Sequence, residues 1–111
     1  IYDLRAKEVT KEALENGKTK VMLTVSAQQF SANGKGKETE QPFAKEVEIA
    51  LFSEDPNNFA IDNKVIYQGL HAIKSGDTVI ELIVDEIPKF AGIDPFVRFI
   101  DRDTGNNIIK L

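Results

Sequence analysis

The residues of this chain that could do chemistry are few and lie apart in the sequence. Its single histidine is His71, whereas zinc hydrolysis needs clustered ligands, such as two histidines one helical turn apart with a glutamate beside the first. The serines lack a Gly-x-Ser-x-Gly context and would all depend on that one histidine. They are Ser26, Ser31, Ser53 and Ser75. We therefore expect His71 to be a partly exposed strand residue, and we expect no catalytic, metal-binding or cofactor-binding residue in the chain.

Carboxylates offer two further candidates. The pairs Glu46/Glu48 and Asp101/Asp103 are each two residues apart, but such residues share a face of a strand as a matter of period, so we interpret both pairs as solvated. Residues 101–107 also place oxygen ligands at alternate positions, as in the first half of a calcium loop. The run lacks the terminal bidentate acid of such loops. A β-turn is the preferred interpretation, and whether this stretch binds a cation stays open.

Composition narrows the class of protein. The chain has 111 residues, of which 41% are hydrophobic and 29% charged, and it has no cysteine. These values fit one domain, residues 1–111, that folds around its own core. A net charge of -4 with lysines scattered among glutamates argues against nucleic acid as a partner. No apolar run approaches the roughly 20 residues that a spanning helix needs, so we expect no direct membrane insertion. Because the start lacks an initiator methionine and a signal-peptide pattern, we expect a fragment of a larger protein.

Period-two alternation of apolar and polar residues predicts short strands. They fall at residues 2–7, 21–26, 46–51, 64–70, 78–84, 96–100 and 108–111. Asn16-Gly17 favours a hairpin turn over a short helical turn at residues 10–17. We expect residues 21–26 to be central, a bulge or strand end at 27–29, a mobile loop at 31–42 and a turn at 74–77. The predicted fold is all-β: an antiparallel two-sheet sandwich, immunoglobulin or fibronectin III-like, with about seven strands.

One predicted strand is apolar on both faces. Ile80, Leu82 and Val84 form one face of residues 78–84, while Val79 and Ile83 flank Glu81 on the other. The second face is either ordinary scatter of exposed aliphatic residues or a patch that docks on another domain of the same polypeptide.

The chain resembles the C-terminal β-sandwich segment that follows the catalytic region in M1-family metallopeptidases. In particular it resembles the bacterial membrane proteins that join ABC-2-type permease segments to an M1 aminopeptidase-like domain. The most specific match is a strand ending in Val84-Asp85, then Pro88, then Ile93-Asp94-Pro95 leading into an apolar run. The full set comprises residues 2–6, 20–25, 36, 38–40, 49–52, 84–85, 88, 91–96 and 100–102.

The resemblance implies a non-catalytic accessory domain that packs on the catalytic domain of the same polypeptide. The zinc motif and the exopeptidase motif of the family are absent here, so the zinc would lie in the parent's catalytic domain and no catalytic residue carries over. The resemblance also implies a soluble, extracytoplasmic domain of a bacterial inner-membrane protein. From their apolar character, the candidate interdomain contacts are Val79, Ile83, Phe90 and Phe96.

The alternative is a free-standing extracellular module for adhesion or ligand recognition, with its site on loops at one end of the sandwich. Several phenylalanines lie near predicted strand ends, but the chain has no tryptophan and only Tyr2 and Tyr67 as tyrosines. That composition makes a poor stacking platform for sugars. A stand-alone enzyme is a third possibility, and it needs a catalytic constellation that the sequence lacks.

Overall fold

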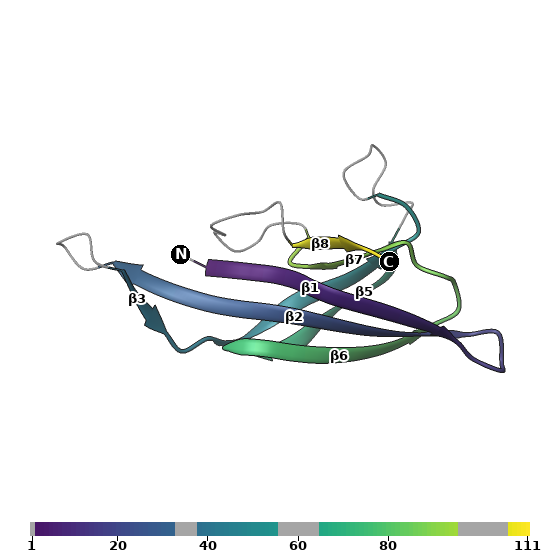
Figure 1. The fold of residues 1–111 in the computed structure, drawn as a ribbon, viewed down its shortest axis with the longest axis horizontal. Helices are drawn as coiled ribbons and strands as arrows, with labels where there is room; N and C mark the ends of the chain where they lie inside the picture. Colours follow the sequence, from purple (N-terminus) through teal and green to yellow (C-terminus); the bar gives the residue numbers. More distant parts are fainter. Residues whose placement is uncertain (1, 33–37, 56–64, 96–106) are drawn as a thin grey trace.

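The computed structural model describes residues 2–32, 38–55, 65–95 and 107–111, which form eight strands in two antiparallel sheets (Figure 1). The strands are β1 (Tyr2–Ala13), β2 (Thr19–Ala32), β3 (Glu38–Gln41), β4 (Ala44–Phe52), β5 (Val65–Lys74), β6 (Gly76–Val84), β7 (Phe90–Ile93) and β8 (Ile108–Lys110). The predicted all-β sandwich is confirmed. Across these residues, no helix occurs that is long and apolar enough to cross a bilayer.

The first sheet is built around β2, as the alternation of Val21, Leu23 and Val25 predicted. β1 pairs with one side of β2 along almost its whole length. On the other side, β6 pairs with the first part of β2, up to Ala27, and β3 pairs with the last part, from Gln29. The sheet is therefore three strands wide, with β6 and β3 following one another along the same side of β2.

The second sheet has the order β5-β4-β7-β8. The chain crosses between the sheets after β3, after β5 and after β6. In the lettering of immunoglobulin-like domains, and with β3 left out as an extra hairpin strand, β1, β2 and β4 are A, B and C. β5 is C′, and β6, β7 and β8 are E, F and G. The two sheets are then A-B-E and C′-C-F-G. This is the Greek-key arrangement of immunoglobulin-like sandwiches, with the fourth strand moved from the first sheet to the second.

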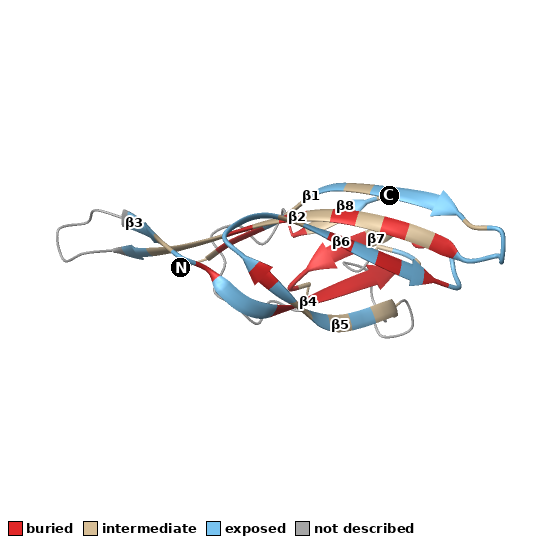
Figure 2. Cartoon of the chain, turned by 90° about the horizontal axis from the view of Figure 1, so that it is seen from below, coloured by how far each residue is buried: buried red, intermediate tan, exposed pale blue. Residues whose placement is uncertain are grey.

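The core lies between the sheets, because one face of each central strand is apolar. Val21, Leu23 and Val25 of β2 are fully buried, and the buried positions alternate along that strand in Figure 2. They belong to one apolar cluster with residues of β4, β7 and β6. The β4 members are Val47, Ile49 and Leu51, and β7 supplies Ala91 and Ile93.

Hydrogen bonds tie two of the crossing segments together at one end of the sandwich. The Ser75 hydroxyl accepts a bond from the Phe43 backbone N–H at 2.5 Å, and the Ser75 N–H donates to the Phe43 carbonyl at 2.8 Å. Phe43 itself is buried, and its ring meets the Tyr2 ring edge to face at 5.8 Å. The entry into β4 and the turn into β6 are thereby fixed to each other.

The hairpin predicted at Asn16-Gly17 is confirmed, since Gly17 has φ +80 in the turn between β1 and β2. The alternative helical turn at 10–17 is wrong, because β1 continues to Ala13. The bulge predicted at 27–29 is also wrong. β2 keeps its register at these residues. The bulge lies in β1, where no residue of β2 is paired opposite Lys7 in the strand ladder.

One predicted loop also needs correction, and one strand was missed. Residues 31–32 and 38–41 of the expected mobile loop are strand, because polar residues of β3 pair with the extension of β2. β7 was not predicted at all. The strand predicted at 96–100 lies outside the described residues. The predicted turn at 74–77 is confirmed at Ser75, and β5 runs on to Lys74 instead of ending at Leu70.

The polar face of β1 is not uniformly exposed to solvent. Asp3, which alternates with the apolar residues Tyr2 and Leu4, is nevertheless buried. Its carboxylate accepts two hydrogen bonds from the Arg5 guanidinium, at 3.0 and 3.1 Å, and bidentate pairing of this kind offsets part of the cost of removing a carboxylate from water. The alternation in the sequence correctly places Asp3 on the face opposite the core residue Leu4, but it does not predict that this position is buried.

Replacing Leu23 by alanine tests the packing of β2 against the second sheet. Because Leu23 is fully buried, Leu23→Ala should lower the free energy of unfolding by about 2–5 kcal/mol. Met22→Ala is the matched control. Met22 is the adjacent residue on the opposite face and is only half-buried, so its loss should cost less than about 1 kcal/mol. Urea unfolding measures both, and equal costs would contradict the assigned faces.

Candidate functional site

The outer face of β6 is the surface that the sequence singled out, and the structure leaves its aliphatic residues in solvent. Val79 is 58% exposed and Ile83 is 55% exposed, whereas Ile80, Leu82 and Val84 point into the core. The exposed face reads Asp77, Val79, Glu81, Ile83, so acids and aliphatic residues alternate along it.

Lysines from the neighbouring strands pair with the acids of this face. The Lys20 ammonium lies 3.5 Å from the Glu81 carboxylate, and Lys7 reaches from β1 across β2 to Asp77 at 3.0 Å. All four side chains keep at least a third of their surface in solvent, so each pair contributes little to stability. The result is a flat, mixed face in which Val79 and Ile83 stand between exposed ion pairs.

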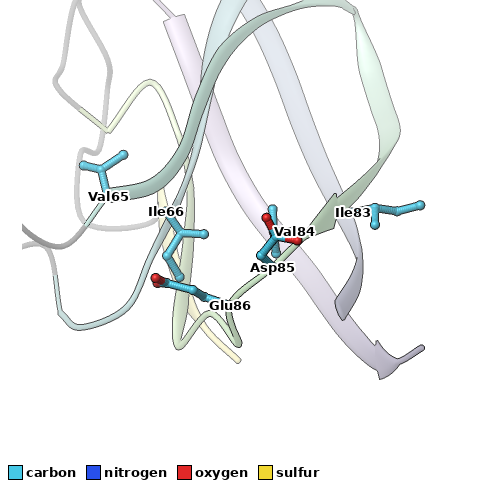
Figure 3. Close-up of a pocket in the computed structure, with 6 residues that line it drawn as sticks. All are labelled: Val65, Ile66, Ile83, Val84, Asp85 and Glu86. Carbon is cyan, nitrogen blue, oxygen red and sulfur yellow. The ribbon is translucent and has the colours of Figure 1, made fainter. Parts of the chain in front are cut away.

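A groove opens at the end of β6, where it diverges from the start of β5 (Figure 3). The groove has a volume of about 310 Å³ and is lined by Val65, Ile66, Ile83, Val84, Asp85 and Glu86. In Figure 3 the Ile66 side chain extends toward Glu86, and Ile83 stands at the far rim. An aliphatic residue at the start of β5 therefore lies near a carboxylate that follows β6.

The four predicted contact residues do not all lie on one surface. Val79 and Ile83 share the outer face of β6. Phe90 is on β7 in the second sheet, and its alternation with Ala91 and Ile93, which are in the core, puts it on the opposite outer face of the sandwich. Phe96 lies outside the described residues. Among the three described members of the set, Val79 and Ile83 share a surface and Phe90 does not.

His71 lies on the inner face of β5, as its pairing with core residue Val47 requires. Its Nε2 is 2.7 Å from the Tyr67 hydroxyl, and the two rings are tilted at 54°. Gly69, between them, leaves the space that the Tyr67 ring occupies, because a Cβ there would come within 2.6 Å of the Tyr67 hydroxyl oxygen. His71 is half-buried, so its prediction as a partly exposed strand residue is confirmed.

One member of the predicted carboxylate pairs differs from expectation. Glu46 is exposed, but Glu48 is buried, and its Oε2 accepts a hydrogen bond from the Gln68 side chain at 2.8 Å. The interpretation of Glu48 as solvated is therefore wrong, because the outer face of β4 is covered at this point. Asp101 and Asp103 lie outside the described residues. Within the ranges that the structure covers, no three histidine, cysteine or acidic side chains cluster as metal ligands would.

Sequence reasoning missed a buried polar corner between β7 and β8. The Asp94 N–H donates to the Glu48 carbonyl at 2.7 Å, and the Asn107 side chain donates to the Asp94 carbonyl at 3.0 Å. Asp94 has φ +45, which aspartate tolerates better than most residues. Asp94 falls within Ile93-Asp94-Pro95, the segment most specific to the family resemblance, and this backbone role is a physical reason for an acid at that position.

Comparisons with protein-family models, with curated proteins and with solved structures each found no match to this chain. The resemblance to M1-family peptidases therefore rests on the sequence alone.

Gly69→Ala tests the arrangement of Tyr67 and His71. The added methyl group should displace the Tyr67 ring and break its hydrogen bond to His71, because the contact of 2.6 Å is shorter than real Cβ atoms accept. Tyr67→Phe is the matched control, since it removes the same hydrogen bond but keeps the ring. NMR of the His71 imidazole should show the same change in both variants. An unchanged imidazole signal in Gly69→Ala would contradict the geometry.

Proposed function

We propose that this chain is a non-catalytic accessory β-sandwich domain of a larger bacterial membrane protein. Its parent would be a zinc aminopeptidase-like protein of the M1 type joined to ABC-2-type permease segments, with this domain outside the cytoplasm. The outer face of β6 docks on the catalytic domain of the same polypeptide. The observation that carries the proposal is the exposure of Val79 and Ile83 on the same outer face of one regular strand.

The energetics suit a contact within one polypeptide. Each aliphatic residue is already about half-buried, so covering the remainder would stabilise docking by roughly 1 kcal/mol per side chain. That is too little to hold two separate proteins together. A covalently joined domain needs less, because linkage raises the effective concentration to the millimolar range. Domain interfaces of this kind bury about 600–1,500 Å² and are more polar than obligate ones, which fits a face where acids alternate with valine and isoleucine.

The strand that presents this face is held rigidly. β6 pairs with β2 in unbroken register from Gly76 to Val84, and β2 is clamped on its other side by β1. A rigid sheet face lets the domain hold a neighbour in one orientation without moving itself. In this proposal the zinc ion and its ligands belong to the catalytic domain, and this chain supplies support only.

The rival role, a free-standing recognition module, calls for exposed aromatic side chains. Phe43 and Phe52 are buried, while Tyr2, Phe30, Tyr67 and Phe90 are half-buried. The most exposed large apolar side chains that the structure describes are aliphatic: Leu70, Val79, Ile83 and Ile87. This distribution favours the accessory role.

The double substitution Val79→Lys and Ile83→Lys in the full-length protein tests the proposal. It should lower thermal stability and peptidase activity together, because two ammonium groups would have to be desolvated in the docked interface. The matched control is Leu70→Lys with Ala72→Lys, which adds the same charge at exposed positions of β5 on the outer face of the other sheet. The control should leave both quantities unchanged. Unchanged stability and activity in the β6 variant would refute the docking face, and a parent without a zinc-binding HExxH helix upstream would refute the family assignment.

A further inference from the structure

The first sheet lacks a strand at one position that immunoglobulin-like sandwiches can fill. It is three strands wide, whereas the second sheet has four. β5 lies at the edge of the second sheet, and the matching place in the first sheet is the one beside β6. In sandwiches with A-B-E-D sheets this place holds strand D. Among the described residues, β6 pairs with β2 alone.

The core residues are slightly less covered along β6 than along β2. The inner-face residues of central β2, Val21, Leu23 and Val25, are 0% exposed. The equivalent residues of β6 are Ile80, Leu82 and Val84, and they keep 6%, 7% and 8% of their surface in solvent. On the opposite sheet, Tyr67 and His71 point inward from β5 yet remain half-buried. An added strand beside β6 would cover both sets.

The open edge of β6 also lacks the features by which other edge strands resist pairing. β1 has a bulge at Lys7 and carries Arg5 and Lys11 along its edge. β5 has a register shift at Ile66, and β8 is only 3 residues long. β6 is 9 residues long, keeps its register throughout, and contains no lysine, arginine or proline.

We infer that the edge of β6 binds an extended peptide segment of a partner protein by strand addition. The segment would present basic and aliphatic side chains in alternation. On the outer face it would meet Ile83, Glu81, Val79 and Asp77 in turn, and opposite charges directly across a ladder stabilise the pair. At the end of the strand, the Asp85 carboxylate lies 3.5 Å from the Lys18 ammonium, while Glu86 lines the groove and favours a further cation. Backbone pairing supplies the affinity, and the side-chain alternation supplies the specificity.

Strand addition needs only this chain and a peptide, so it stands apart from the docking face proposed above. The probe is the capped peptide Val-Thr-Lys-Thr-Val-Thr-Lys, whose valines and lysines would oppose the outer face of antiparallel β6. Its controls are the same peptide with glutamate for each lysine, and the same peptide N-methylated at alternate amides. The method is two-dimensional amide NMR of the isotope-labelled chain with peptide up to about 1 mM.

The lysine peptide should shift the amide signals of β6 together with those of Tyr67 and His71. The N-methylated peptide should not bind, because its ladder hydrogen bonds are lost, and the glutamate peptide should bind more weakly. Glu81→Lys should weaken the lysine peptide by about fivefold, which is the scale of one cross-strand charge pair. Glu8→Lys is the matched control, since it makes the same charge change on β1 and should alter nothing.

Three results would overturn the inference. The first is no shift with the lysine peptide at the highest concentration. The second is binding that survives N-methylation or maps to another edge. The third is a concentration-dependent dimer in which β6 of a second copy already occupies the edge, measured by sedimentation of the free chain.

Discussion

The contact between the inner faces of β2 and β4 is the interaction on which the rest of the structure depends. Val21, Leu23 and Val25 belong to the same buried cluster as Val47, Ile49 and Leu51, and burying such side chains stabilises by about 1.5–3 kcal/mol each. Every other strand is positioned by pairing with one of these two, directly or through β7. The chain must cross from one sheet to the other after β3, β5 and β6, and the Phe43–Ser75 hydrogen bonds fix two of those crossings together.

In that arrangement β6 presents two surfaces to which a partner could bind. Its inner face belongs to the core, its outer face holds Val79 and Ile83 in solvent, and in the described part of the chain its far edge has no neighbour. The docking face and the open edge are separate properties of one strand. The first depends on side chains that project away from the sandwich, and the second depends on backbone groups that lie in the plane of the sheet. Only the open edge follows from a first sheet that is one strand narrower than the second.

Alternation in the sequence predicted the two-sheet architecture because β2, β4 and β6 each keep an apolar face over several residues. It failed where tertiary contacts decide the structure. β7 was missed because Gly92 resembles loop punctuation, whereas its missing side chain admits Ile108 Cδ1 at 2.6 Å from where a Cβ would stand. β3 was missed because its residues are polar and are ordered only by pairing with β2. The exposure of Val79 and Ile83 agrees with the predicted outward face. The open edge of β6 could not be predicted, because a local pattern of apolar residues does not determine the order of strands in a sheet.

Amide hydrogen exchange of the free chain, measured residue by residue by NMR, tests the central claim most directly. In a strand that is paired on both sides, every amide N–H is hydrogen-bonded and exchanges only on global unfolding. In an edge strand, the N–H groups that point away from the sheet are unpaired and exchange readily with solvent. The structure predicts strong protection along residues 19–27 of β2 and 49–52 of β4, which have a paired strand on both sides. It predicts protection at alternate residues only along β6, where every second N–H points to the open edge. Continuous protection along β6, from Gly76 to Val84, would show that another strand already covers it and would contradict the account.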